Sequence, residues 1–262
     1  TNPPAPAERA SVLIVEDNPV NQLLAVELVS RLGYETAVAW NGREALTALA
    51  SRRFSAVLMD VQMPEMDGIT ATERIRDPAT PVLDHAIPII ALTANAFAED
   101  RARCLAAGMN DFLTKPVDRN RLSAALTQWI RTRTPDGGRA GERAAGGLPP
   151  AARENPQIFD RRALLDRVME DEELAGEVLA AFLGEIEGDM ALLGAAMNRG
   201  DGTAARDAAH TIKGSAANVG AETVRQRAAE IEACCIGGDL PGATQRLHTL
   251  AESIDEFREV AT

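Results

Sequence analysis

The chain has 262 residues, of which 45% are apolar and only 3% are aromatic, and its formal net charge is −12. This length suits one large domain or two ordinary ones. The acidic balance argues against non-specific binding of nucleic acid, which needs a basic surface. No apolar run approaches the roughly 20 residues of a membrane-spanning helix, and three cysteines without metal-type spacing fit reduced thiols in the cytoplasm. We therefore expect a cytoplasmic protein without direct contact to nucleic acid or membrane.

The first half of the chain alternates short apolar runs with helical patterns. Strands are predicted at residues 11–15, 35–40, 56–60, 87–93 and 111–114, and helices at 19–32, 43–53, 69–76, 96–107 and 119–131. Five strands that alternate with five helices predict a doubly wound α/β fold with a parallel sheet. Ligands in such folds bind beyond the carboxyl ends of the strands, so the residues at those ends are the first candidates for a site.

The second half of the chain shows helical patterns throughout, and a segment rich in Gly, Pro, Ala and Arg precedes it. We predict a short lead helix from residue 158 and longer helices at 171–198, 203–219, 222–236 and 242–260, which would form an antiparallel bundle. The expected organisation is a leader at 1–10, an α/β domain at 11–131, a flexible linker at 132–156 and an all-α domain at 157–262. Because the chain begins with Thr1 and not with Met, we expect it to be a fragment of a longer protein.

Polar or charged residues stand at four predicted strand ends, namely Glu16 with Asp17, Asp60, Thr93 and Lys115. A carboxylate can attack a phosphoryl donor when it is held in line and the charge on the transferring group is neutralised. Magnesium suits this chemistry because it binds through one or two carboxylates together with phosphate oxygens and water. We expect Asp60 to be the nucleophile, Asp17 and Asp60 to hold Mg²⁺, and Glu16 to orient metal-bound water. Lys115 would pair with one phosphoryl oxygen, and Thr93 would hydrogen-bond another.

Four segments at these strand ends together resemble a response-regulator receiver domain. They are residues 15–18 (VEDN), 59–68 (MDVQMPEMDG), 92–94 (LTA) and 113–116 (LTKP), and the match spans residues 11–131. The resemblance implies a flavodoxin-like sheet of order 2-1-3-4-5, phosphorylation of Asp60, and Mg²⁺ held by Asp17, Asp60 and the backbone carbonyl of Gln62. It also implies a switch in which Thr93 moves toward the phosphoryl group and Phe112 changes rotamer. In this family the positions of Gln62 and Asn95 influence the lifetime of the phosphoryl group.

Among three histidines, His210 stands out because Lys213 and Gly214 follow it three and four residues later. At about 100° per residue we expect its imidazole to face water, opposite an apolar side of the helix. That side carries Ala205, Ala208, Ile212, Ala216 and Val219. Glycine costs about 1 kcal/mol inside a helix, so Gly214 indicates close approach by another molecule. A neutral imidazole can attack a phosphoryl group, and Lys213 can stabilise the resulting charge. His85 and His248 lack such neighbours and are interpreted as structural or solvated.

The His-x-x-Lys-Gly pattern on a helical bundle resembles the histidine-phosphotransfer domain, over residues 157–262. A receiver followed by such a domain resembles the C-terminal part of a bacterial hybrid sensor histidine kinase. The resemblance implies a phosphorelay from a kinase histidine to Asp60, then to His210, then to a downstream response regulator. It further implies that the kinase core lies in a missing N-terminal part and that the parent, a protein-histidine kinase, is anchored in the inner membrane with this part in the cytoplasm.

Neither a GxxxxGK[ST] phosphate loop nor a Gly-rich ATP lid occurs in the sequence, so we do not expect the chain to phosphorylate itself from ATP. Two other functions remain open. One is a Mg²⁺-dependent phosphatase with an aspartyl nucleophile, although such enzymes usually have a second acid where this chain has Gln62. The other is an interaction module in which the bundle is a docking scaffold without transfer. A complete two-domain relay protein, in place of a fragment, also remains open.

Overall fold

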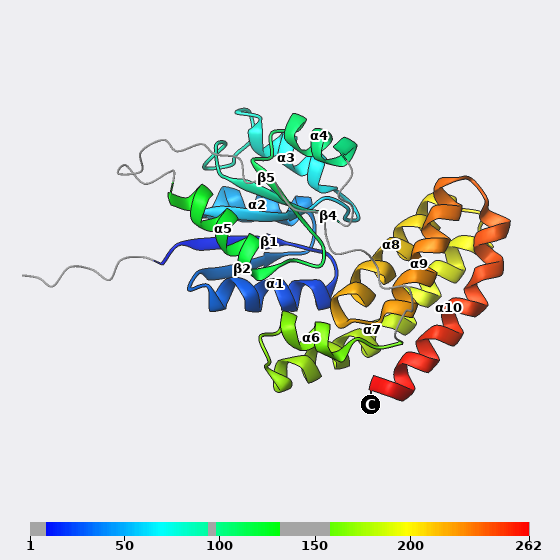
Figure 1. Ribbon diagram of the computed structural model, residues 1–262. Helices are drawn as coiled ribbons and strands as arrows, with labels where there is room; N and C mark the ends of the chain where they lie inside the picture. The colour runs from blue at the N-terminus through cyan, green and yellow to red at the C-terminus, as the bar shows by residue number, and fades with distance from the viewer. Residues whose placement is uncertain (1–8, 94–97, 132–157, 262) are drawn as a thin grey trace, which may run out of the picture. The chain divides into compact units, whose positions relative to one another are not determined.

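The computed structural model describes residues 9–93, 98–131 and 158–261. The chain divides into two compact units, and we describe a sheet-containing part, up to residue 131, and a helical part, from residue 158 on, each by itself (Figure 1). The predicted linker and the first eight residues of the predicted leader lie outside the described residues.

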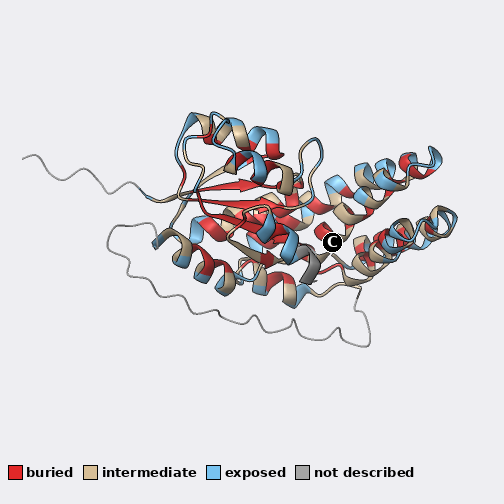
Figure 2. Ribbon diagram, turned by 90° about the horizontal axis from the view of Figure 1, so that it is seen from above, coloured by how far each residue is buried: buried red, intermediate tan, exposed pale blue. Residues whose placement is uncertain are grey.

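The sheet has five parallel strands in the order β2-β1-β3-β4-β5, which confirms the expected topology. The strands are β1 (Ser11–Val15), β2 (Glu35–Ala39), β3 (Ala56–Asp60), β4 (Ile89–Thr93) and β5 (Asp111–Thr114). Strand β4 begins two residues later than predicted, because Pro88 lacks the N–H that would join the ladder. The strands β3 and β4 are buried along their whole length (Figure 2), as the continuous apolar runs of a parallel sheet require.

Helices cover both faces of this sheet. They are α1 (Pro19–Arg31), α2 (Gly42–Ser51), α3 (Gly68–Arg76), α4 (Ala98–Ala106) and α5 (Arg119–Arg131). Apolar residues of α1 and α5 pack on one face, and those of α2, α3 and α4 pack on the other. Three of these helices have a side-chain N-cap. Asn18, Asn41 and Asp67 each accept a backbone N–H of the first turn with their side chains. The caps fix where each strand end turns into a helix.

The helical part contains α6 (Arg161–Arg167), α7 (Glu172–Asn198), α8 (Gly202–Val219), α9 (Glu222–Ile236) and α10 (Leu240–Ala261). The bounds of the four long helices lie within two residues of the predictions, and α9 packs against both α8 and α10. Gly220 ends α8 in the left-handed region at φ 78°, and a Cβ there would lie 2.6 Å from the backbone oxygen of Asp160. Only glycine allows the segment before α6 to cross the end of α8 so closely.

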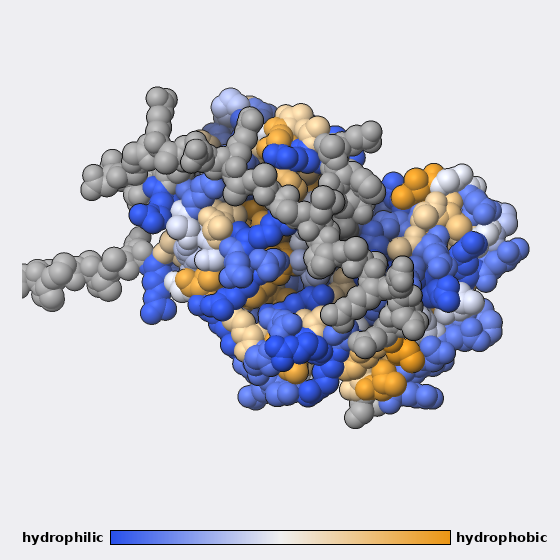
Figure 3. All heavy atoms as spheres, viewed as in Figure 1, coloured by the Kyte–Doolittle hydropathy of each residue, from blue (hydrophilic) through white to orange (hydrophobic). Residues whose placement is uncertain are grey.

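Surface composition agrees with the charge of the chain. On the face shown in Figure 3, hydrophilic side chains dominate wherever described atoms are visible, and apolar side chains form small groups. Within residues 9–93, 98–131 and 158–261, no helix is long and apolar enough to cross a membrane.

Candidate functional site

Three carboxylates gather at the edge of the sheet where β1 and β3 end. Glu16 and Asp17 follow β1 directly and Asp60 is the last residue of β3, and one ligand oxygen from each lies within 4.8 Å of the others. The side chains of Glu16 and Asp60 are almost fully buried. Neighbouring parallel strands carry their carboxyl ends to one edge, which is why residues 43 positions apart in the sequence meet there.

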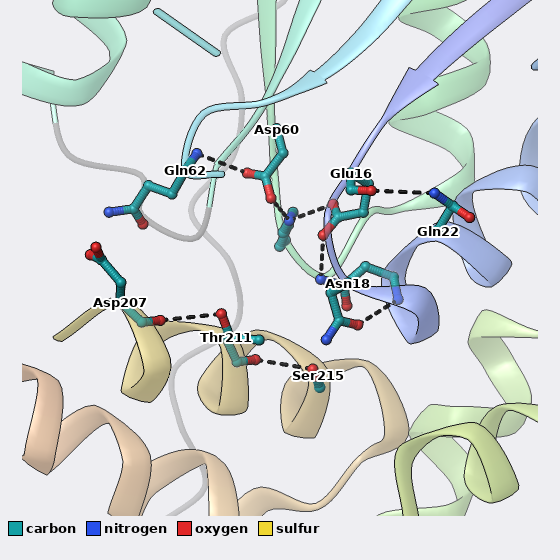
Figure 4. Close-up of polar contacts among 10 residues, drawn as sticks. Glu16, Asn18, Gln22, Asp60, Gln62, Asp207, Thr211 and Ser215 are labelled. Atoms are coloured by element: carbon teal, nitrogen blue, oxygen red, sulfur yellow. Dashed lines mark hydrogen bonds and ion pairs between the residues drawn. The ribbon is translucent and has the colours of Figure 1, made fainter. Parts of the chain in front are cut away.

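Lys115, directly after β5, reaches into this acidic cluster. Its Nζ lies 2.6 Å from Glu16 Oε2 and 2.6 Å from Asp60 Oδ2, and its side chain is also buried. Figure 4 shows the carboxylates of Glu16 and Asp60 turned toward the same nitrogen. The ammonium thus binds both carboxylates, and its pairing with a phosphoryl oxygen stays a prediction.

The buried charges shift one another's pKa values. Burial, followed by the charge of Asp60, raises the pKa of Glu16 to about 8, although Lys115 and Asn21 act in the opposite direction. Burial alone would lower the pKa of Lys115, but the charges of Asp60 and Glu16 outweigh it and raise that pKa above its ordinary value. Lys115 therefore stays charged, and three acidic side chains share this one cation.

The other receiver-like residues surround this cluster. The backbone N–H of Gln62 donates to Asp60 Oδ1 over 3.2 Å, and Thr93, at the end of β4, is buried. Phe112 is half-buried against the sheet core, with the guanidinium carbon of Arg101 4.9 Å from the centre of its ring. Asn95 lies outside the described residues.

Sequence reasoning missed two amides in the first turn of α1. Asn21 Nδ2 donates to Glu16 Oε1 over 2.8 Å, and Gln22 Nε2 donates to the backbone oxygen of Glu16 over 3.3 Å (Figure 4). A signal was present in the sequence, because the cap Asn18 and Pro19 start a helix whose first turn must lie beside Glu16, the residue that follows β1.

His210 lies on α8 and is held by an acid that the sequence analysis did not consider. Its Nδ1 lies 2.6 Å from Oε1 of Glu232 on α9, and Lys213 Nζ donates to Glu232 Oε2 over 2.5 Å. The imidazole was expected to face water, but its side chain is only 13% exposed. That prediction was wrong because it considered α8 alone, whereas Glu232 on the neighbouring helix binds Nδ1 of the imidazole.

The expected apolar side of α8 is largely confirmed. Ala205, Ile212, Ala216 and Val219 are buried, while Ala208 is partly exposed.

The two remaining histidines have the ordinary surroundings that we expected. His85 Nδ1 lies 2.9 Å from the backbone oxygen of Ile75; since a carbonyl only accepts, this nitrogen carries a proton. His248 is 82% exposed and lies 3.2 Å from Glu252.

Comparison with known proteins assigns both parts of the chain. The family model of the response regulator receiver domain matches residues 12–127, and that of the Hpt domain matches residues 177–260. The chain carries a receiver domain followed by an Hpt domain. The two domains together indicate a phosphorelay function.

Similar proteins include bacterial sensor kinases that are much longer than this chain. The sensor histidine kinase GacS of Pseudomonas protegens is 35% identical over 208 residues, which are 78% of this chain and 22% of that protein. The sensor protein EvgS of Escherichia coli is 29% identical over 258 residues, which are 97% of this chain and 20% of that protein. The chain thus spans about a fifth of the length of these relatives.

Solved structures similar to the chain cover the receiver half. One is the receiver domain of the sensor histidine kinase PA1611 from Pseudomonas aeruginosa, with a magnesium ion in its active site cleft; it is 43% identical, with a TM-score of 0.43, and the match covers 47% of this chain and 98% of that one. Another is a co-crystal structure of the Saccharomyces cerevisiae phosphotransfer protein Ypd1 with the receiver domain of Ssk1, where the identity is 31%, the TM-score is 0.43, and the match covers 49% of this chain and 94% of that one.

Proposed function

We propose that the chain relays a phosphoryl group through Asp60 and His210 as part of a hybrid sensor histidine kinase. The observation that carries this proposal is the pairing of Asp60 with Lys115 at the sheet edge, inside a cluster of carboxylates. The proposed domain bounds are 11–131 for the receiver, 132–156 for the linker and 157–262 for the Hpt domain.

In the first step an oxygen of Asp60 attacks the phosphorus of a phosphohistidine on the kinase core. The P–N bond breaks as the new P–O bond forms, and the departing imidazole nitrogen keeps the electron pair. Lys115 Nζ, 2.6 Å from Asp60 Oδ2, would neutralise an oxygen of the incoming group. The hydroxyl of Thr93 would hydrogen-bond another oxygen, and Thr93 and Phe112 would form the switch.

The donor set at this edge of the sheet fits Mg²⁺. Three carboxylates offer the hard oxygen ligands that the ion prefers. Asp17, Asp60 and the backbone carbonyl of Gln62 would hold the ion, with Glu16 beside it. When bound, Mg²⁺ supplies positive charge that stabilises the transferring phosphoryl oxygens.

In the second step His210 takes the phosphoryl group from Asp60. Burial tends to raise the pKa of Glu232, but its hydrogen bonds from His210 and Lys213 hold that pKa below its ordinary value, so the carboxylate is ionised at neutral pH. An ionised carboxylate only accepts, which leaves the proton of the neutral imidazole on Nδ1 and the electron pair on Nε2. Nε2 attacks the phosphorus, the P–O bond to Asp60 breaks, and the carboxylate leaves with the electron pair. Lys213 would stabilise the charge on the phosphoryl group.

The expected partners are a histidine kinase core, in the same protein, and a downstream response regulator that accepts the group from His210. The sensor kinases that resemble the chain support the first partner. We propose a cytoplasmic location for the two domains, with a parent protein anchored in the inner membrane.

The phosphatase alternative is weaker, because the residue two positions after the nucleophile is Gln62. Its side-chain amide is far too weakly acidic to act as a general acid. Steady turnover of a small phosphate ester by the purified chain would favour the phosphatase reading, and a single acid-labile phosphate per chain would favour the relay.

The relay is tested with the full chain, a purified kinase core and radiolabelled ATP. Acid-labile, base-stable phosphate is expected on His210 in the parent chain and is expected to be absent in Asp60→Asn. Asp67→Asn is the matched control, because Asp67 caps α3 and its loss leaves the carboxylate cluster intact. Labelling of His210 in Asp60→Asn would overturn the order of transfer, and a His210→Gln variant that still supports output from the regulator would favour a docking role.

A further inference from the structure

We infer that Asn21 is a positioning residue for the magnesium site, acting through the carboxylate of Glu16. The inference rests on the proposed function of that site. Asn21 belongs to the first turn of α1 and is 8% exposed, and its Nδ2 donates to Glu16 Oε1 over 2.8 Å. Its backbone N–H is bound separately, by the side chain of Asn18 over 3.0 Å, so the amide is not needed to start the helix.

The two oxygens of Glu16 are held by different kinds of donor. Lys115 binds Oε2 and also binds Asp60, whereas Asn21 binds Oε1. When Lys115 turns toward a phosphoryl oxygen on Asp60, Glu16 loses its charged partner. The amide of Asn21 is neutral and belongs to a helix, so it stays in place throughout the reaction.

Gln22 completes the arrangement from the same turn. Its Nε2 donates to the backbone oxygen of Glu16 over 3.3 Å (Figure 4), so one turn of α1 holds both the main chain and the carboxylate of this acid. Hydrogen bonds from outside a metal's ligand sphere orient the groups around the ion, and removing one typically weakens metal binding 10- to 100-fold. The geometry therefore assigns to Asn21 a share of the Mg²⁺ affinity.

The test is a calorimetric titration of the full chain with MgCl₂, without any phosphoryl donor. Asn21→Ala should weaken Mg²⁺ binding about tenfold, and Asn21→Leu, which fills the same space, should do the same if the alanine variant folds poorly. Asn41→Ala is the matched control, because Asn41 is equally buried but binds the backbone of Glu44 at the start of α2; its Mg²⁺ affinity should equal that of the parent.

A double-mutant cycle with Glu16→Ala tests whether Asn21 influences Mg²⁺ affinity through Glu16. In that background the Asn21 substitution should change Mg²⁺ affinity no further. Equal affinity of the parent and Asn21→Ala would overturn the role of Asn21 while leaving the relay untouched, and so would an equal loss in both backgrounds. A parent chain that binds no Mg²⁺ at millimolar concentration would overturn both proposals.

At saturating Mg²⁺ the Asn21 variants should recover most of the parent's rate of Asp60 phosphorylation from a small acyl phosphate. A residue needed for the chemistry itself would leave the rate low at any Mg²⁺ concentration, and that result would also contradict a positioning role.

Discussion

Replacing Glu232 with Gln should slow phosphorylation of His210 while keeping a side chain of the same shape beside Nδ1. In the parent the ionised carboxylate accepts the Nδ1 proton over 2.6 Å, which in the proposed relay would leave Nε2 as the nucleophile. A glutamine amide can instead donate to Nδ1, which moves the imidazole proton to Nε2 and blocks attack. The substitution keeps the shape of the side chain, so it changes which imidazole nitrogen carries the proton and leaves the packing unchanged.

The size of the effect follows from the bond that is lost. A hydrogen bond to a charged group contributes about 1.5–3 kcal/mol, and the side chains involved are no more than 13% exposed, so solvent screens it little. Since about 1.4 kcal/mol corresponds to a factor of ten in rate, transfer to His210 should fall roughly 10- to 100-fold.

The assay starts from the chain phosphorylated on Asp60 by a small acyl phosphate, and follows acid-labile phosphate on His210 over time. Nitrogen NMR of the His210 imidazole reports the tautomer in the same samples. Glu230→Gln is the control, because Glu230 is on the same helix but is 45% exposed and pairs with Arg227. Transfer at the parent's rate in Glu232→Gln, with an unchanged imidazole spectrum, would refute the reasoning.

Three further outcomes are expected. Lys115→Ala leaves two buried carboxylates without their cation and should destabilise the receiver by about 3–5 kcal/mol in urea unfolding, with partial recovery on adding Mg²⁺. Gly68→Ala would bring a Cβ within 2.1 Å of the backbone oxygen of Asp60 and should lower the melting temperature, whereas Gly184→Ala, with open space around it in α7, should stabilise by about 0.5–1 kcal/mol. Because the pKa of Glu232 is lowered by folding, its stabilisation is complete above the ordinary value of 4.5 and is lost as the pH falls through the folded value. The stability gap between the parent and Glu232→Gln should therefore narrow as the pH falls below 4.5.

The acidic cluster could be predicted because the topology of a parallel sheet leaves little freedom. Once β1 and β3 are neighbours, Glu16 and Asp60 must lie at the same edge, and Lys115 after β5 projects from that edge too. What the sequence did not reveal is the pairing within the cluster. The contact of Lys115 with both carboxylates depends on side-chain charge balance, which the order of strands does not determine.

The surroundings of His210 could not be predicted in the same way. Periodicity assigns faces to one helix, but the rotation of α9 against α8 depends on how their side chains interlock. Glu232 follows His210 by 22 residues across the turn at Gly220, and no fixed spacing relates positions on two packed helices. The same limitation explains why His210 was expected to face water.

The two sites hold their reactive groups with partners of opposite charge. In the proposed relay, the charge of Lys115 beside Asp60 would make that carboxylate a better leaving group once it carries a phosphoryl group. Glu232 does the reverse for His210, since a carboxylate on Nδ1 makes Nε2 more basic and more nucleophilic. Each partner thus favours the same direction of transfer, from the aspartate to the histidine. Because Lys213 shares the carboxylate of Glu232, the charge of that carboxylate acts on Lys213 as well as on the imidazole.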